Sequence, residues 1–268
     1  WGVRCSDMDF SSYDWIAKSE ANLEIILAKI PTCAIANSFR GAEIYINRGF
    51  PEKKFQVVAN GIDTDQYYFS SMGRRSIRAE FGIDQDAPIL GSVARLDPMK
   101  GYFDLMLSAK IIHSERKNVK FFIVGEGHLR SKLISLIEDY GLQSAVLLLG
   151  ERGDMRDIYS AMDIVISSSI FGEGFSNSLG EAMSCERLCI ATDVGDSARL
   201  ISSSGLVIPP GDPNALASAA TKILNYDSST YAAAGNTARR EILENYSPEI
   251  MVSKTLSIMK SHDEVNHF

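Results

Sequence analysis

The stretch DIVISSSIFGEGFSNSLGEAM, residues 163–183, predicts a buried strand, a glycine-rich turn and a helix in immediate succession. Open α/β sheets bind nucleotides at this kind of junction, where a strand's carboxyl end meets a helix's amino end. Glu173 lies in the turn and Glu181 in the helix, so both carboxylates are expected to face one crevice. The first N–H groups of the helix, around Ser176 and Asn177, favour a phosphate, and the carboxylates accept hydrogen bonds from sugar hydroxyls. A sugar nucleotide would satisfy all of these groups.

From residue 87 onward, short apolar runs alternate with amphipathic segments of helical length on both sides of this stretch. The runs include PILGSVA, KFFIVG, AVLLLG and RLCIATD, and they are typical of strands that are buried on both faces. Strand and helix in alternation predict a Rossmann-like α/β domain, a parallel sheet with helices on both faces. The segment PPGDPNALA, residues 209–217, marks the last turn of this pattern, with Asp212 or Asn214 starting a helix.

The chain before residue 60 follows a different pattern. It predicts an amphipathic helix over about residues 12–30, a strand at CAIANS (33–38), a helix at FRGAEIYINRG (39–49) and a strand at FQVVANG (55–61). These are too few strands for an independent doubly wound domain, so they are interpreted as the end of a first domain. The chain also starts at Trp1 without an initiator Met, and we expect it to be a piece of a longer protein.

Three segments are therefore expected. Residues 1–56 are a remnant of an N-terminal Rossmann-like domain, and residues 57–245 form a C-terminal domain. Residues 246–268 form a last helix, opened by Ser247 and Pro248. Asn60 and Gly61 predict a plain turn between the domains.

Composition and charge exclude several classes of protein. The chain has 268 residues, 45% of them hydrophobic, and a net charge of −7, which argues against nucleic-acid binding. Arg74, Arg75 and Arg78 form the main basic cluster; we interpret it as a solvated helix face, with contact to anionic lipid as the alternative. The sequence has no apolar stretch long enough to span a bilayer and opens on no signal peptide, which predicts a cytoplasmic protein, with the inner face of the membrane as a further location.

The cysteine and histidine pattern predicts neither a disulfide scaffold nor a metal site. The four cysteines include no CxxC pair, so they are expected to be reduced core residues. The four histidines lack the spacing that metal ligands use, and no metal is expected.

Two further motifs follow strands and precede helices. In SVARLDPMKG, residues 92–101, Arg95 and Lys100 would suit a diphosphate, the alternative being two solvated loop charges. In FFIVGEG, residues 121–127, Gly125 and Gly127 predict a tight turn that borders a base or phosphate. It is not a dinucleotide fingerprint, because Arg130 occupies the place of the third glycine.

Polar residues in two more loops have simpler interpretations. Asp196 is expected to cap the helix that begins at Ser197, with contact to a donor sugar as the alternative. Ser167, Ser168 and Ser169 lack the elbow and the histidine of a serine nucleophile, so they are expected to be loop hydroxyls near the phosphate.

Taken in order, the motifs resemble those of the family 4 glycosyltransferases of the GT-B fold, also called glycosyl transferases group 1. The residues that carry the resemblance are NGID (60–63), ARLDPMKG (94–101), FIVGEG (122–127), GEGFSNSLGEAMSC (172–185), ATDVGDSARLI (191–201) and VIPPGDP (207–213). The resemblance covers about residues 57–245. The sequence around GEAMSC and TDVGDSA is similar to that of the family members that build bacterial capsule, exopolysaccharide or O-antigen. Glu186 and Arg187 stand where the family more often has a glycine.

The resemblance implies a retaining transfer of a sugar from a nucleotide-diphosphate donor to an acceptor hydroxyl, without a metal or another cofactor. Arg95 and Lys100 would then hold the diphosphate and stabilise the leaving group, and Glu173 would bind sugar hydroxyls near the anomeric carbon. Glu181 would bind the ribose hydroxyls. The other donor-binding residues implied are Gly125, Gly127, Gly174, Phe175, Ser176 and Asn177.

By the resemblance, residues 57–245 would be the donor-binding domain, residues 1–56 the acceptor-side remnant, and residues 246–268 a helix that crosses back to the N-terminal part. The resemblance also implies partners and leaves alternatives. The acceptor would be a saccharide or a lipid-linked saccharide, held mainly by a first domain of which most is absent here, and that missing part would make any peripheral membrane contact. One alternative is a nucleotide-sugar binding module without turnover. Another is a different GT-B enzyme, such as a sugar-nucleotide epimerase or a phosphorylase.

Overall fold

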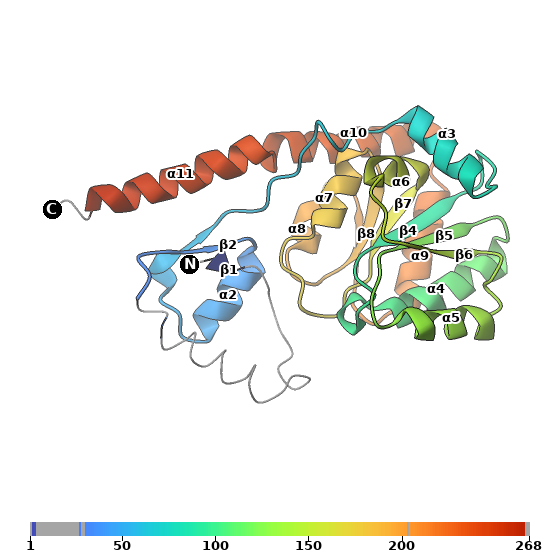
Figure 1. The fold of residues 1–268 in the computed structure, drawn as a ribbon, viewed down its shortest axis with the longest axis horizontal. Coiled ribbons are helices and arrows are strands. Elements are labelled where there is room, and N and C mark those ends of the chain that lie inside the picture. The colour runs from blue at the N-terminus through green and yellow to red at the C-terminus, as the bar shows by residue number, and fades with distance from the viewer. Residues whose placement is uncertain (1, 4–26, 28–29, 203, 266–268) are drawn as a thin grey trace.

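The computed structural model describes residues 2–3, 27, 30–202 and 204–265. Within that part of the chain, a large α/β unit and a small one are joined by two chain crossings (Figure 1). The helix expected over about residues 12–30 lies almost entirely outside the described residues, as do Trp1 and Cys5.

The large unit contains, in the described residues, a six-stranded sheet in which every neighbouring pair of strands is parallel. In spatial order the strands are β6 (Val146–Gly150), β5 (Lys120–Val124), β4 (Ile89–Val93), β7 (Ile164–Ser167), β8 (Leu188–Thr192) and β9 (Leu206–Ile208). The chain runs outward from β4 to β6, returns to the centre at β7 and then runs outward the other way. The carboxyl ends of β4 and β7 therefore flank the point where strand order reverses, the usual ligand site of such sheets. The expected parallel α/β sheet is confirmed.

The strands enter two separate hydrophobic cores, because successive side chains point to opposite faces. Phe121 packs in the core beneath α4 (Tyr102–Glu115), α5 (Arg130–Asp139) and α9 (Pro213–Leu224). Phe122 packs in the other core, beneath α3 (Ser71–Glu80), α6 (Met155–Ala161), α7 (Asn177–Ser184), α8 (Ser197–Ile201) and α10 (Ser228–Asn245). Burial of each such side chain contributes about 1.5–3 kcal/mol. Both faces are covered, which is why the strands are apolar throughout.

Local sequence signals fix several helix ends. The side chain of Asp212 accepts a hydrogen bond from the N–H of Ala215, and Pro213 occupies the first turn of α9, as the sequence predicts. Pro248 begins α11 (Pro248–Val265) in the same way, after Ser247.

The small unit consists of a parallel three-stranded sheet in the described residues, β1 (Gly2–Val3), β2 (Ala34–Ala36) and β3 (Phe55–Val57), with α2 (Phe39–Asn47) beside it. A short 3₁₀ turn, η2 (Glu52–Lys54), precedes β3. From α10, α11 continues toward the side of the molecule that carries the small sheet (Figure 1). At the crossing, the N–H of Gly61 donates to Sδ of Met251, and the N–H of Ile62 donates to the carbonyl of Tyr246.

The basic cluster on α3 is not a solvated face, so that interpretation is wrong for two of its three arginines. Arg78 is 0% exposed and Arg74 is half-buried, and both form ion pairs of 2.8 Å with Asp163. Both also donate to carbonyls at the carboxyl end of α6, where partial negative charge gathers. Only Arg75 of the cluster is exposed.

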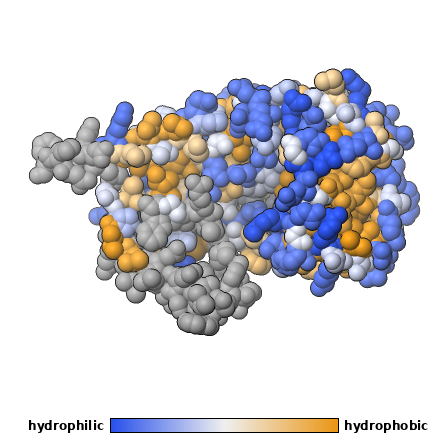
Figure 2. Space-filling model, viewed as in Figure 1, coloured by the Kyte–Doolittle hydropathy of each residue, from blue (hydrophilic) through white to orange (hydrophobic). Residues whose placement is uncertain are grey.

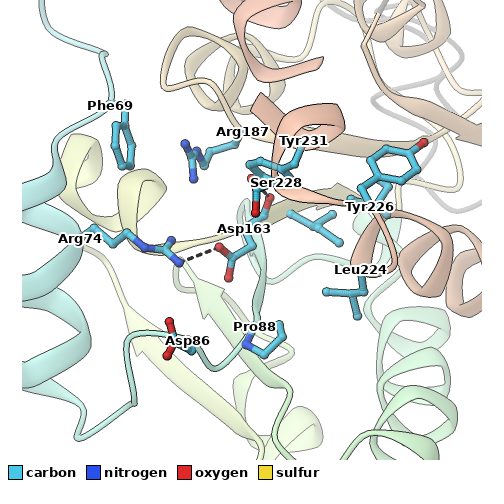
Figure 3. Close-up of a pocket in the computed structure, with 12 residues that line it drawn as sticks. Phe69, Arg74, Asp86, Pro88, Asp163, Arg187, Leu224, Tyr226, Ser228 and Tyr231 are labelled. Atoms are coloured by element: carbon cyan, nitrogen blue, oxygen red, sulfur yellow. Dashed lines mark hydrogen bonds and ion pairs between the residues drawn. The ribbon is translucent and has the colours of Figure 1, made fainter. Parts of the chain in front are cut away.

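Of these arginines, Arg74 borders a pocket of about 500 Å³ at the amino-terminal edge of the sheet (Figure 3). Arg187 lies over the Phe69 ring at 4.5 Å, and Tyr231 donates from its hydroxyl to the backbone carbonyl of Asp163. The pocket is lined by none of the residues that the sequence predicts to bind a donor. It lies at the opposite edge of the sheet from them.

Among the described cysteines, Cys185 and Cys189 are buried in the core and Cys33 is half-buried, and none of the three forms a disulfide. No helix in the described part of the chain combines the length and the apolar character that crossing a bilayer requires. On α11, Val252, Leu256 and Met259 are about half-exposed, and Figure 2 shows hydrophobic surface over that helix.

Candidate active site

Four loops meet at the carboxyl edge of the large sheet, and backbone hydrogen bonds join them. The loop after β4 meets the loop after β5, where the N–H of Leu96 donates to the carbonyl of Glu126 at 2.9 Å. It also meets the loop after β7, where Ile170 donates to Met99 at 2.8 Å. The loop after β8 completes the group, since the N–H of Asp196 donates to Gly174 at 3.1 Å. Motifs that are far apart in the sequence thus form one surface.

Glycines allow this close approach. Gly125 has φ 129°, and a Cβ at that position would overlap the carbonyl oxygen of Ala94. A Cβ on Gly127 would lie 2.5 Å from the carbonyl oxygen of Leu96. The two glycines therefore form the predicted tight turn, and it packs directly against the loop that carries Arg95 and Lys100.

Lys100 and Glu173 form the central ion pair of this surface. Nζ of Lys100 lies 2.9 Å from both carboxylate oxygens of Glu173, and the two side chains are only 17% and 11% exposed. The hydroxyl of Ser169 donates to Oε1 of Glu173 at 3.2 Å, and that of Ser168 donates to the backbone carbonyl of Lys100 at 2.8 Å. Two of the three serines expected near the phosphate thus hold the ion pair in place.

Lys100 ends a short 3₁₀ turn, η3 (Pro98–Lys100), which Asp97 caps by accepting from the N–H of Met99 at 3.1 Å. Arg95 precedes this turn and is exposed. Arg95 takes part in none of the salt bridges that link the described residues. The structure thus places both predicted cations on one loop, one paired with Glu173 and the other open to solvent.

The amino end of α7 is open. Ser176 is its N-cap, and in this fully described segment the Ser176 side chain makes no capping hydrogen bond. The first N–H groups of the helix, from Asn177 on, therefore remain for water or an anionic ligand. Gly174 and Phe175, just before the helix, are buried, and the Phe175 ring packs on Tyr246 at 5.3 Å.

Asn60 reaches the same helix end, which the sequence analysis missed. Its side-chain amide donates to Oδ1 of Asn177 at 2.9 Å. The Asn60–Gly61 turn is therefore more than a plain interdomain connection. The neighbouring Asp63 accepts from the N–H groups of Asp65 and Gln66, as aspartates commonly do in turns.

Glu181 lies in the second turn of α7 and has different partners from Glu173. The hydroxyl of Tyr159 donates to Oε2 of Glu181 at 2.7 Å, and the ring of Tyr67 packs edge-on against that of Tyr159 with centroids 6.1 Å apart. Burial raises the pKa of Glu181, and hydrogen bonds from Tyr159 and Tyr67 partly oppose the rise. Burial, together with the charge of Glu181, raises the pKa of Tyr67 to about 12.

Asp196 occupies the N-cap position of α8 but does not cap that helix with its side chain, so the prediction of a capping bond is wrong. Its carboxylate instead accepts from the N–H of Phe39 at 2.7 Å and from that of Arg40 at 2.9 Å, at the start of α2 in the small unit. The guanidinium of Arg199 lies 4.1 Å from the centre of the Phe39 ring. The reason is competition for the Asp196 carboxylate, because the first turn of α2 in the small unit offers it two N–H groups.

Glu186 is the one described residue other than glycine with a left-handed backbone, at φ 62°. This explains why a glycine is more usual at that position in the family that the sequence resembles. Hydrogen bonds hold this loop in place, because Arg187 donates to the carbonyls of Cys185 and Met162.

Comparisons with known proteins agree with this geometry. Over 180 residues the chain is 31% identical to the poly(ribitol-phosphate) alpha-N-acetylglucosaminyltransferase of Staphylococcus aureus, covering 66% of this chain and 36% of the relative. Over 208 residues it is 26% identical to the UDP-Gal:alpha-D-GlcNAc-diphosphoundecaprenol alpha-1,3-galactosyltransferase of Escherichia coli, covering 75% of this chain and 53% of the relative. The chain thus spans about half the length, or less, of these relatives.

A solved structure of similar fold is that of HepE from Anabaena in complex with UDP, with a TM-score of 0.87 and 22% identity, covering 97% of this chain and 72% of that chain. The similarity shows the GT-B glycosyltransferase fold. A family model described as glycosyl transferases group 1 matches residues 73–241 and so covers more than half of the chain. The chain therefore belongs to the glycosyl transferases group 1 family.

Proposed function

We propose that this chain carries the donor site of a retaining, metal-independent glycosyltransferase that moves a sugar from a nucleotide-diphosphate sugar to an acceptor hydroxyl. One observation carries the proposal. Lys100, Glu173 and the open amino end of α7 lie together at the edge of the sheet where the strand order reverses. A diphosphate needs cations and free N–H groups, and a sugar needs a carboxylate. All three kinds of group lie on this edge.

In the proposed reaction, a bond forms between the acceptor oxygen and the anomeric carbon, and the bond between that carbon and the diphosphate breaks. The departing nucleoside diphosphate takes the electron pair, and the acceptor proton passes to it or to solvent. Arg95 and Lys100 would stabilise the charge that develops on the diphosphate, which is the role of an electrostatic catalyst. Glu173 would bind the sugar hydroxyls, and Glu181 the ribose hydroxyls.

The proposed setting is bacterial surface polysaccharide synthesis in the cytoplasm, at the inner face of the membrane. The two curated relatives support it, since their names give a poly(ribitol-phosphate) and a diphosphoundecaprenol-linked sugar as acceptors. The acceptor of this chain would be a saccharide or a lipid-linked saccharide. A second candidate is a nucleotide-sugar binding module without turnover, because the described small unit holds only three strands with which to hold an acceptor.

The test is calorimetric titration of the chain with UDP, GDP, ADP and NAD, with and without EDTA. We expect one nucleoside diphosphate to bind equally well in both conditions. Binding should be lost in the double variant Arg95→Ala/Lys100→Ala and kept in Arg75→Ala, which removes an exposed arginine elsewhere in the domain. Binding of NAD alone, or of no nucleotide by the folded chain, would refute the proposal.

Turnover separates the two candidates. The chain is incubated with the sugar nucleotide whose diphosphate binds and with a lipid-linked saccharide, and the new linkage is read by NMR. A product with the donor's anomeric configuration supports the retaining enzyme. Tight donor binding without any product supports the binding module.

A further inference from the structure

A tyrosine reaches Glu181 from the core side of its helix. Tyr159, on α6, is fully buried, and its hydroxyl donates to Oε2 of Glu181 on α7 at 2.7 Å. Glu181 itself is half-buried. The hydrogen bond therefore comes from the protein interior, on the side that a ligand cannot reach.

Tyr159 is itself held firmly. The ring of Tyr67 meets it edge-on, with an interplanar angle of 72°. The backbone carbonyl of Tyr67 in turn accepts from the hydroxyl of Ser184 at 2.6 Å and from the guanidinium of Arg239 at 3.1 Å. The hydroxyl of Tyr159 therefore has a fixed position, set by packing among α6, α7, α10 and the linker segment that carries Tyr67.

The Glu181 carboxylate has acceptor sites for the protein and for a ligand, and the hydrogen bond from Tyr159 takes up one of them. An ionised carboxylate offers about four lone-pair sites on two oxygens. Tyr159 occupies one of them on Oε2 and so fixes the rotation of the group about its last bond. The sites that neither Tyr159 nor the hydroxyl of Tyr67 occupies are then available in one orientation. A vicinal pair of hydroxyls, as on ribose, is bound best by a carboxylate that does not have to be ordered first.

We propose that Tyr159, with Tyr67 packed against it, positions the Glu181 carboxylate for the ribose hydroxyls and so makes the site select ribonucleotides over deoxyribonucleotides. This inference rests on the proposed function and concerns the same donor site. Tyr159 is a positioning residue, because its hydroxyl touches Glu181 and is buried away from the ligand. The raised pKa of Glu181 agrees with the arrangement, since a buried carboxylate that lost its tyrosine donor would be harder to keep ionised.

The test combines removal of the tyrosine hydroxyl with removal of the ribose hydroxyls of the ligand. Wild type, Tyr159→Phe and Tyr231→Phe are titrated with UDP, GDP and ADP and with the 2′,3′-dideoxy form of each. Tyr231→Phe is the matched control, because it removes the hydroxyl of another tyrosine of the same domain, at the opposite edge of the sheet (Figure 3). Thermal melting confirms that each variant is folded.

We expect wild type to bind the ribonucleotide at least tenfold more tightly than its dideoxy form. Tyr159→Phe should lower affinity for the ribonucleotide by about fivefold to tenfold, the effect of losing one ordinary hydrogen bond, and leave the dideoxy affinity unchanged. Tyr231→Phe should leave the ratio of the two affinities as in wild type. Tyr67→Phe keeps the packing of the ring and removes the Tyr67 hydroxyl, which also hydrogen-bonds to Glu181, so as a second variant it should lower the ratio in the same direction.

The outcomes separate the two proposals. If Tyr159→Phe weakens both ligands equally, its role is structural and the inference is overturned, while the donor site stands. The inference also fails if wild type binds the ribonucleotide and the dideoxy form with equal affinity. If wild type binds none of the six nucleotides, the proposed function fails, and the inference with it.

Discussion

The Lys100–Glu173 ion pair gives a prediction that the structure allows to be worked through in detail. The perturbation is a double-mutant cycle of Lys100→Met, Glu173→Gln and the two together, because each substitution removes a charge and keeps most of the side chain's volume. In the native protein, Nζ lies 2.9 Å from both carboxylate oxygens, and both side chains are less than one fifth exposed. Either single substitution therefore leaves one partly buried charge without its partner.

The expected magnitude lies between two limits. Exposed ion pairs contribute about 0.2–1 kcal/mol, and breaking a fully buried pair costs about 3–5 kcal/mol. At this burial we expect each single variant to lose about 1–3 kcal/mol of unfolding free energy. The double variant should lose less than the sum, with a coupling of about 1–2 kcal/mol. For a domain of this size, each kcal/mol corresponds to a shift of about 2–4 °C in Tm.

The assay is urea unfolding followed by circular dichroism, combined with titration of each folded variant with nucleoside diphosphate. Lys100→Met should weaken the binding, because a cation is lost from the diphosphate site. Glu173→Gln should not weaken it, because the competing carboxylate charge is gone and Lys100 is released. Additive losses of stability would show that the pair is not coupled. A larger loss of nucleotide affinity in Glu173→Gln than in Lys100→Met would refute the assignment of Lys100 to the diphosphate.

Three further predictions concern the neighbouring groups. Gly125→Ala should destabilise the domain by about 1–3 kcal/mol, read by urea unfolding, because a left-handed φ and a clash with the Ala94 carbonyl both oppose a side chain. Glu181→Gln should raise Tm at neutral pH. The pKa of Glu181 is higher in the folded state than in the unfolded state, so the folded protein binds more protons. The stability of the wild type therefore falls as pH rises above the ordinary glutamate pKa. The advantage of Glu181→Gln should vanish at pH values below about 4, where the group is protonated in both states, and a Tm difference that does not depend on pH would contradict this. Asp196→Ala should loosen the contact between the two units, because two N–H groups at the start of α2 lose their acceptor, and faster hydrogen exchange at Phe39 than in wild type is the expected result.

The sequence predicts the sheet and the location of the site because both depend on local patterns. Strands buried on both faces must be apolar throughout, and loops at the carboxyl ends of parallel strands must share one edge. Lys100 and Glu173 could therefore be assigned to a single site although 73 residues separate them. The start of α7 also follows from its sequence, since Ser176 marks where the helix begins, whereas the absence of a capping bond from Ser176 is known only from the structure.

The partners of individual side chains depend on packing between distant elements, and the sequence does not show them. Arg78 is an example: as part of a basic cluster it resembles a solvated residue, yet it pairs with Asp163, 85 residues away. The sequence did hold one indication that Arg78 is buried. Arg78 directly follows Ile77, and Gly73 and Ile77 lie on the buried face of α3. Asp196 is a second example, since its partner N–H groups lie 157 and 156 residues away in the other unit.

The structure pairs the two groups that the proposed donor would need, and this has a consequence for recognition. In the proposed function Lys100 would bind the diphosphate and Glu173 the sugar, and in the structure each neutralises the other. On this proposal, a nucleoside diphosphate alone would draw Lys100 away and leave Glu173, a carboxylate only 11% exposed, without its cation. A complete sugar nucleotide would give both groups new partners at once, because its hydroxyls would donate to Glu173 while its diphosphate accepted from Lys100. Exchange of one ion pair would therefore couple recognition of the diphosphate to recognition of the sugar, and the intact donor would be the ligand that compensates both charges.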